Sequence, residues 1–306
     1  MNVLVTGITG YIGSRVAPRL ARDGHSVRGL SRRGGELPGH PEVEVRRGDA
    51  VTGAGLERAL DGIEVAYFLI HSMESSADGS FAARDRAAAV NFARAARAAG
   101  TRRIVYLGGL IPAGGPRSAH LASRLEVERT LLAAIPDSVA LRASIVIGAG
   151  SSSFRFLVRL VERLPVLAVP AWRTSRTTPI DERDMIELLA RAALSGEVSG
   201  QTLDVGGPEE ITYGALIDRI RDHLLLARPT ISFKRLTVTP IASRIAAVIA
   251  NEDHALIGPL MESLGADLLA RDQRAITLLG VRLHSLDSSI EHALRELEAI
   301  EPLAAR

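Results

Sequence analysis

Short apolar runs alternate with longer segments of helical periodicity through the first half of the chain. The runs have the length of strands and fall at 2–6, 25–32, 43–46, 65–70, 103–107 and 139–147. Between them, apolar residues recur at the spacing of one helix face over 11–22, 56–60, 81–99 and 119–134. Strands that alternate with helices in this way predict an α/β fold with a doubly wound parallel sheet.

This rhythm changes after Gly148. Helical patterns cover 155–164, 181–194, 213–226 and 287–298, and one further strand is expected at 202–205. We therefore expect one domain over residues 1–150, to which residues 181–206 return, and a smaller lobe made of residues 151–180 and 207–306. The apolar segment 236–262 is expected to form either a lid over an apolar ligand or a packed core or dimer surface.

A glycine-rich turn follows the first apolar run directly. Gly7, Gly10 and Gly13 lie between a strand and a helix, which is the arrangement that binds a dinucleotide pyrophosphate. Glycine permits a sharp turn and a close approach of phosphate to backbone, and the helix N-terminus adds free N–H groups. Such turns also occur for structural reasons, but this position favours a nicotinamide cofactor. The loop residues expected to contact the cofactor are Gly7, Thr9, Gly10, Tyr11, Ile12 and Gly13.

The end of the second strand indicates which cofactor is bound. An NAD-binding fold places a carboxylate there for the ribose 2′-hydroxyl, whereas this chain has Ser31, Arg32 and Arg33. Two guanidinium groups suit a 2′-phosphate, so NADP(H) is favoured, although the same arginines also fit a solvated surface turn. Asp49, with Ala50 beside it, either accepts a hydrogen bond from the adenine amine or forms a turn.

Composition excludes several classes of protein. The chain has 306 residues, of which 46% are hydrophobic and 24% charged, as in ordinary globular proteins. The net charge is +2 with scattered basic residues, so no nucleic-acid surface is expected. The absence of cysteine excludes thiolate chemistry and suits the cytoplasm, and the eight dispersed histidines give no metal-site spacing. We expect no signal peptide and no transmembrane segment, and either a monomer or a homodimer.

Longer segments of the sequence carry a family resemblance. These include VLVTGITGYIGSRV, NFARAARAAGTRRIVYLGG and LDVGGPEEITY, which together extend over residues 1 to about 215. In them the chain resembles the atypical and extended short-chain dehydrogenases of the NmrA-like NAD(P)H-binding branch. The resemblance implies a Rossmann domain with a small substrate lobe and, usually, NADPH. The chain is also similar to the simocyclinone-type angucyclinone ketoreductases, which lack the usual catalytic residues.

The catalytic residues of this family are absent from the chain. The resemblance places Gly109 at the serine position, His120 at the tyrosine position and Arg124 at the lysine position. The single lysine, Lys234, lies far from these positions. His120 is a candidate proton donor or an ordinary helix-surface residue, and Arg124 is a candidate for holding the nicotinamide ribose or an oxyanion.

A second pair of candidates ends the fourth strand. His71 and Ser72 lie where open parallel sheets bind ligands, and they either take part in catalysis or pack while their backbone lines the cofactor. Ile70 and His71, together with Arg124, complete the set expected to contact the cofactor. A hydroxyl of the substrate itself is a third source of the proton.

Two classes of function remain open at this point. The first is an NADPH-dependent ketoreductase whose hydrophobic substrate is bulky and aromatic or quinone-like. The second is a non-enzymatic NADP(H)-binding redox sensor or assembly factor. The missing catalytic residues favour the second class, and the cofactor loop with the apolar C-terminal segment favours the first.

Overall fold

The computed structural model describes residues 1–70, 81–116, 118–163, 167–169, 171–226, 230–232 and 265–301. Its centre is a seven-stranded sheet with the strand order β11-β6-β5-β4-β1-β2-β3, in which every neighbouring pair is parallel. These strands are β1 (Asn2–Thr6), β2 (Ser26–Ser31), β3 (Glu44–Arg47), β4 (Val65–Phe68), β5 (Arg103–Gly109), β6 (Val139–Ala143) and β11 (Thr202–Val205). The predicted doubly wound Rossmann-type fold is therefore confirmed.

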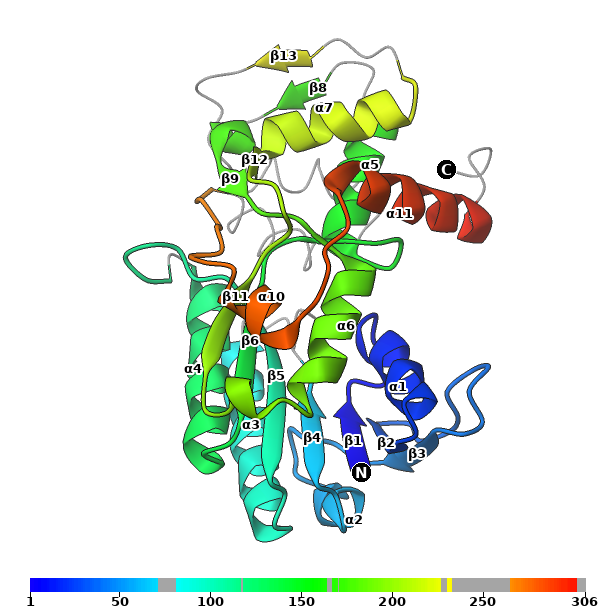
Figure 1. The fold of residues 1–306 in the computed structure, drawn as a ribbon, viewed down its shortest axis with the longest axis vertical. Helices are drawn as coiled ribbons and strands as arrows, with labels where there is room; N and C mark the ends of the chain where they lie inside the picture. The colour runs from blue at the N-terminus through cyan, green and yellow to red at the C-terminus, as the bar shows by residue number, and fades with distance from the viewer. Residues whose placement is uncertain are drawn as a thin grey trace.

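Helices cover both faces of this sheet (Figure 1). The helices that pack against it are α1 (Gly13–Arg22), α2 (Leu56–Leu60), α3 (Phe81–Ala98), α4 (Ala119–Ala134), α6 (Glu182–Ala192) and α10 (Arg274–Leu279). Side chains alternate along each strand, so Val3 and Val5 enter the core shared with α1, α6 and α10, while Leu4 enters the core shared with α2, α3 and α4. Both layers exclude water, which explains why the strands read as apolar runs.

A third core lies beyond the carboxyl ends of the strands. It joins α5 (Ser152–Arg163), α7 (Tyr213–His223) and α11 (Leu286–Ile300), with Trp172 and Tyr213 in edge-to-face contact inside it. We call these three helices the small lobe; α7 and α11 lie at the upper end of Figure 1. Short strand pairs surround it: β7 (Val146–Ile147) with β10 (Ile180–Asp181), β9 (Arg176–Thr177) with β12 (Ile211–Thr212), and β8 (Leu167–Val169) with β13 (Thr230–Ser232).

Several details differ from the sequence predictions. The single strand expected over 139–147 divides, because β6 ends at Ala143 and β7 pairs outside the sheet with β10. The strand expected over 103–107 continues through Gly108 and Gly109. Helix α1 continues through Pro18 to Arg22. The assignment of residues 151–180 and 207–306 to a separate lobe stays a prediction.

Among the described helices, none combines the length and the apolar character needed to cross a bilayer.

Candidate active site

One cavity of about 690 Å³ lies at the carboxyl ends of the parallel strands. Residues from the ends of β2, β5 and β6 and from the loops after β1 and β4 line it, as open α/β sheets place their ligands. The small lobe supplies the other wall, through Phe156 and Leu157 of α5 and Tyr213 of α7. The cavity therefore connects the glycine-rich loop with the apolar side chains of the lobe.

The glycine-rich loop has the geometry that a pyrophosphate requires. Gly7 has a φ of +66°, and a Cβ atom there would lie 2.9 Å from the carbonyl oxygen of Leu69. A Cβ atom at Gly13 would overlap the carbonyl group of Gly7, so α1 can start close to β1 only without one. A Cβ atom at Gly10 would meet only the Gly7 oxygen, at 3.1 Å, and its other side is open. The residues present thus fit a dinucleotide phosphate group.

The residues predicted to bind a 2′-phosphate lie at the end of β2. Ser31 and Arg32 line the cavity, whereas Arg33 does not. Both arginines are exposed, and Arg33 donates its backbone N–H to Ser31 Oγ at 3.3 Å. Asp49 and Ala50 also line the cavity, and Asp49 Oδ1 accepts from Val51 N at 2.8 Å. Both interpretations of Asp49, turn former and adenine neighbour, are therefore compatible with its position.

Asn91 is a supporting residue that the sequence analysis missed. Its Nδ2 donates to the carbonyl oxygens of Ala50 and Val51, at 3.2 and 2.8 Å. Since Asn91 lies on α3, these hydrogen bonds hold the loop after β3 against that helix. A lone asparagine within an alanine-rich helical segment was the only signal that could have indicated it.

The structure brings together His120 and Arg124, as their spacing on one helix face predicted. Helix α4 begins after Ser118, whose hydroxyl accepts from Leu121 N at 3.2 Å, so His120 lies in the first turn. Arg124 Nε donates to His120 Nε2 at 3.0 Å, and both residues line the cavity. Burial, with a smaller contribution from the charge of Arg124, lowers the pKa of His120 to about 4. His120 is therefore neutral at pH 7 and carries its hydrogen on Nδ1.

Gly109 completes this group of three. A Cβ atom on Gly109 would lie 3.8 Å from Arg124 Cδ, which places the end of β5 beside the guanidinium stem. Tyr106, on the same strand, donates its hydroxyl to the carbonyl oxygen of Arg124 at 3.3 Å. Burial raises the pKa of Tyr106 to about 12, so this hydroxyl keeps its hydrogen. Gly109, His120 and Arg124 thus lie together, and their correspondence to the usual serine, tyrosine and lysine stays a prediction.

The apolar wall of the cavity was not predicted from the sequence. It consists of Ile145, Phe156, Leu157, Tyr213 and Leu268. Leu268 is held in place by its backbone, because its N–H donates to the carbonyl oxygen of Arg176 at 2.8 Å. Ser144, Ser151, Ser152 and Ser153 add hydroxyl groups to the same end. No short sequence pattern indicates these residues, because they come from distant segments that the tertiary fold brings together.

Several predicted positions lie outside the described residues. They are His71 and Ser72, and the apolar segment 236–262. Ile70, next to this pair, lines the cavity. The roles proposed for His71 and Ser72 stay predictions.

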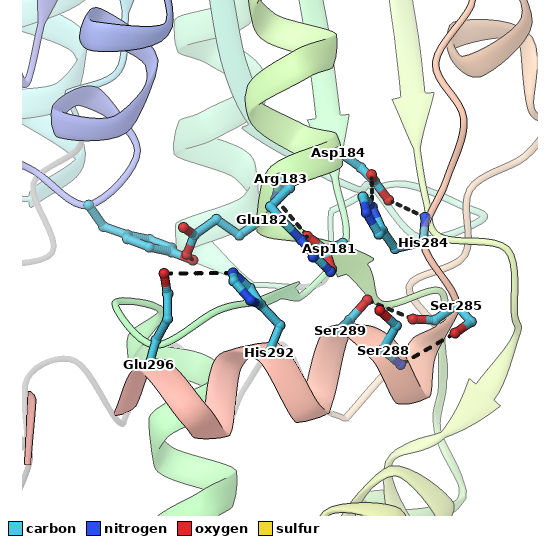
Figure 2. Close-up of polar contacts among 11 residues, drawn as sticks. Asp181, Glu182, Arg183, Asp184, His284, Ser285, Ser288, Ser289, His292 and Glu296 are labelled. Carbon is cyan, nitrogen blue, oxygen red and sulfur yellow. Dashed lines mark hydrogen bonds and ion pairs between the residues drawn. The ribbon is translucent and has the colours of Figure 1, made fainter. Parts of the chain in front are cut away.

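A second polar cluster lies between α6 and α11 (Figure 2). Asp181, Asp184 and His284 each offer one ligand atom, and these atoms lie within 4.8 Å of one another. Their oxygens already have partners, because Asp181 binds Arg183 at 2.7 Å and Asp184 accepts from the ring and the backbone of His284 at 2.6 and 2.8 Å. Burial raises the pKa of Asp184, opposed by these two hydrogen bonds. We interpret this cluster as a structural contact that fixes the start of α6 to the segment before α11.

Comparisons with known proteins support the cofactor site. Residues 7–134 match a family of NAD(P)H-binding domains. The chain is 34% identical over 187 residues to a ceramide reductase of Caulobacter vibrioides, which is 60% of this chain and 57% of that protein. It is 32% identical over 138 residues to a 3 beta-hydroxysteroid dehydrogenase/Delta 5-->4-isomerase of Mycobacterium tuberculosis, which is 40% of this chain and 37% of that protein. The matches thus span little more than half of the first relative and less of the second.

Solved structures share the whole fold. A UDP-glucuronic acid 4-epimerase of Bacillus cereus in complex with NAD has a TM-score of 0.75 at 17% identity and covers 98% of this chain and 99% of its own. A UDP-glucose 4-epimerase of Thermotoga maritima also has a TM-score of 0.75, at 14% identity, with the same coverage of 98% and 99%. At these identities the likeness concerns the fold alone.

Proposed function

We propose that this chain, whose residues 7–134 match NAD(P)H-binding domains, is an NADPH-dependent reductase of a carbonyl group on a bulky, hydrophobic substrate. The observation that carries the proposal is the continuity of the cavity. A single hollow extends from the glycine-rich loop, past His120 and Arg124, to Phe156, Leu157 and Tyr213. A protein that only senses the cofactor has no need of an apolar chamber beside the reacting ring.

The preference for NADPH rests on the end of β2. Ser31 and Arg32 line the cavity there, and no carboxylate follows before Glu36. A guanidinium group forms charge-assisted hydrogen bonds with a 2′-phosphate, whereas NAD-binding folds use a carboxylate for the free hydroxyl. Arg33 contributes less in this proposal, because it does not line the cavity.

The glycine-rich loop and Arg32 would hold NADPH, which would supply a hydride for the carbonyl carbon of the substrate. Negative charge then develops on the carbonyl oxygen, and the fixed positive charge of Arg124 stabilises it. His120 holds Arg124 through Nε2 and, being neutral at pH 7, offers no imidazolium proton. We therefore assign the proton that the oxygen needs to a hydroxyl of the substrate, as in a phenol beside a quinone carbonyl.

The apolar wall indicates the substrate class. Ile145, Phe156, Leu157 and Leu268 present hydrocarbon to the reacting end, and the nearby serines suit hydroxyl or carbonyl groups on the substrate rim. Two relatives are named for ceramide and for a hydroxysteroid, which are large apolar molecules with hydroxyl groups. We propose an aromatic or quinone-like substrate of comparable size.

A crystal structure with NADPH tests this function. We expect the nicotinamide ring beside Gly109 and Arg124, with free space over its C4 atom toward Phe156. Transfer of deuterium from C4-deuterated NADPH to the product alcohol of a quinone-type substrate would add a chemical test. If side chains fill the space over C4, the protein cannot reduce a bulky carbonyl there, and the non-enzymatic NADP(H)-binding function replaces the reductase.

A further inference from the structure

Arg84 is a cavity residue that the proposed reaction does not use. It lies in the first turn of α3 and lines the same cavity as His120 and Arg124. Its side chain is half-buried, and within the described part of the chain it makes no hydrogen bond or ion pair. Other arginines of α3 face away from the cavity; Arg86, for example, pairs with Glu126 on the surface.

The neighbours of Arg84 place it at the reacting end of the cavity. Three residues before it, the ring of Phe81 lies 6.3 Å from the ring of His120. One residue after it, buried Asp85 accepts a hydrogen bond from Ser123 Oγ at 3.4 Å, and Ser123 precedes Arg124. Contacts on both sides therefore hold this turn of α3 against the turn of α4 that carries His120 and Arg124.

The charges that line the cavity are unbalanced. Among the described residues that line it, Arg84 and Arg124 contribute positive charge near α4, and Asp49 is the one carboxylate, at the adenine end. A half-buried guanidinium group without a counter-charge has lost part of its hydration, and an anion that binds there restores the lost interaction. The 2′-phosphate accounts for Arg32, and the developing oxyanion accounts for Arg124. Arg84 has no such partner in the proposed function.

We propose that Arg84 is an anion-binding residue that holds a carboxylate or phosphate group at the reacting end of the cavity. The inference rests on the proposed function, since it concerns the same cavity, and adds that the ligand there is amphipathic. The apolar part lies against Phe156 and Leu157, and the anionic group lies against Arg84. The anion belongs either to the substrate or to the pyrophosphate of the cofactor, and the two sources give different results.

The first measurement is the affinity for NADPH and for inorganic pyrophosphate, by fluorescence and calorimetry. The proteins compared are the wild type, Arg84→Gln and the control Arg97→Gln, which removes the same charge from the exposed end of α3. If Arg84 binds the cofactor, both Kd values rise about tenfold or more in Arg84→Gln alone, as expected for losing a charge-assisted hydrogen bond.

The second measurement uses the NADPH-saturated proteins with dodecanoate, dodecyl phosphate and neutral dodecanol. If Arg84 binds the substrate, Arg84→Gln loses about tenfold or more in affinity for the two anions while dodecanol binding and the NADPH Kd stay unchanged. Arg84→Lys should restore part of this loss. The proposal is overturned if Arg84→Gln matches Arg97→Gln in both measurements, including the case in which the wild type binds neither anion. These are binding readouts, so they remain valid if hydride transfer fails.

Discussion

The hydroxyl of Tyr11 in the glycine-rich loop donates a hydrogen bond to the carboxylate of Glu182, which lies 171 residues later at the start of α6. Arg15 binds the same carboxylate, and its guanidinium carbon lies 4.8 Å from the centre of the Tyr11 ring. Burial, and then the charge of Glu182, raise the pKa of Tyr11, so its hydroxyl remains a donor. Figure 2 shows Glu182 beside the polar cluster between α6 and α11. The contact of Tyr11 with Glu182 connects the glycine-rich loop to the start of α6.

The Tyr11 ring also explains why Gly150 has no side chain. A Cβ atom on Gly150 would overlap the ring, and the φ of Gly150 is one that alanine accepts. We expect Gly150→Ala to lower the free energy of unfolding by ~1–3 kcal/mol in the wild type through overpacking. In a Tyr11→Ala background the same change should have almost no effect. Urea denaturation of the four proteins gives the coupling energy, and additive effects would contradict this steric relationship.

Gly10→Val should abolish cofactor binding with little loss of fold. A Cβ atom at Gly10 would lie 3.1 Å from the Gly7 oxygen and within 4 Å of no other described atom beyond its chain neighbours, so a small shift should admit it. The branched side chain would then occupy the approach of the pyrophosphate. Gly196→Val is a suitable control, because Gly196 is exposed, has an ordinary φ and has open space around it. Quenching of NADPH fluorescence measures the outcome. A Gly10→Val protein that binds NADPH like the wild type would place the cofactor elsewhere.

Arg32→Ala should weaken NADPH binding by about tenfold or more and leave NADH binding nearly unchanged, because only NADPH carries the 2′-phosphate. Arg33→Ala should have a smaller effect, since Arg33 lies outside the cavity. Calorimetric titration of both variants with both cofactors distinguishes these roles. Equal affinities of the wild type for NADPH and NADH would contradict the proposed preference.

The pKa of His120 can be measured without any substrate. Its value of about 4 predicts that the ring stays neutral at pH 5.5 in an NMR titration, with the hydrogen on Nδ1. Because the pKa is lower in the folded state than the usual ~6.5, the neutral ring favours folding at higher pH, and this contribution is lost as the pH falls from about 6.5 to 4. His120→Phe should therefore show a smaller loss of stability over this range. A His120 midpoint at pH 6 or above would restore it as a candidate proton donor.

The local pattern of the sequence was sufficient for most of the sheet. The helix expected over 119–134 is α4 with the same bounds, and the predicted strand at 202–205 is β11. Such elements are long or strongly apolar, so their periodicity is enough to predict them from the sequence. The run 139–147 was wrong as one strand, because an apolar run does not specify its partner. Strands of two or three residues, such as β9 and β12, are too short to show a period.

The sequence by itself determined the parallel sheet, the glycine-rich loop and the helix face that His120 and Arg124 share. These follow from short-range spacing, because the glycine turn and the helix face each lie within a few residues. The tertiary structure alone decided the apolar wall, the neutral state of His120 and the exclusion of Arg33 from the cavity. Burial and charge depend on which distant segments come into contact, as Glu182 and Tyr11 do. A local sequence pattern does not contain this information.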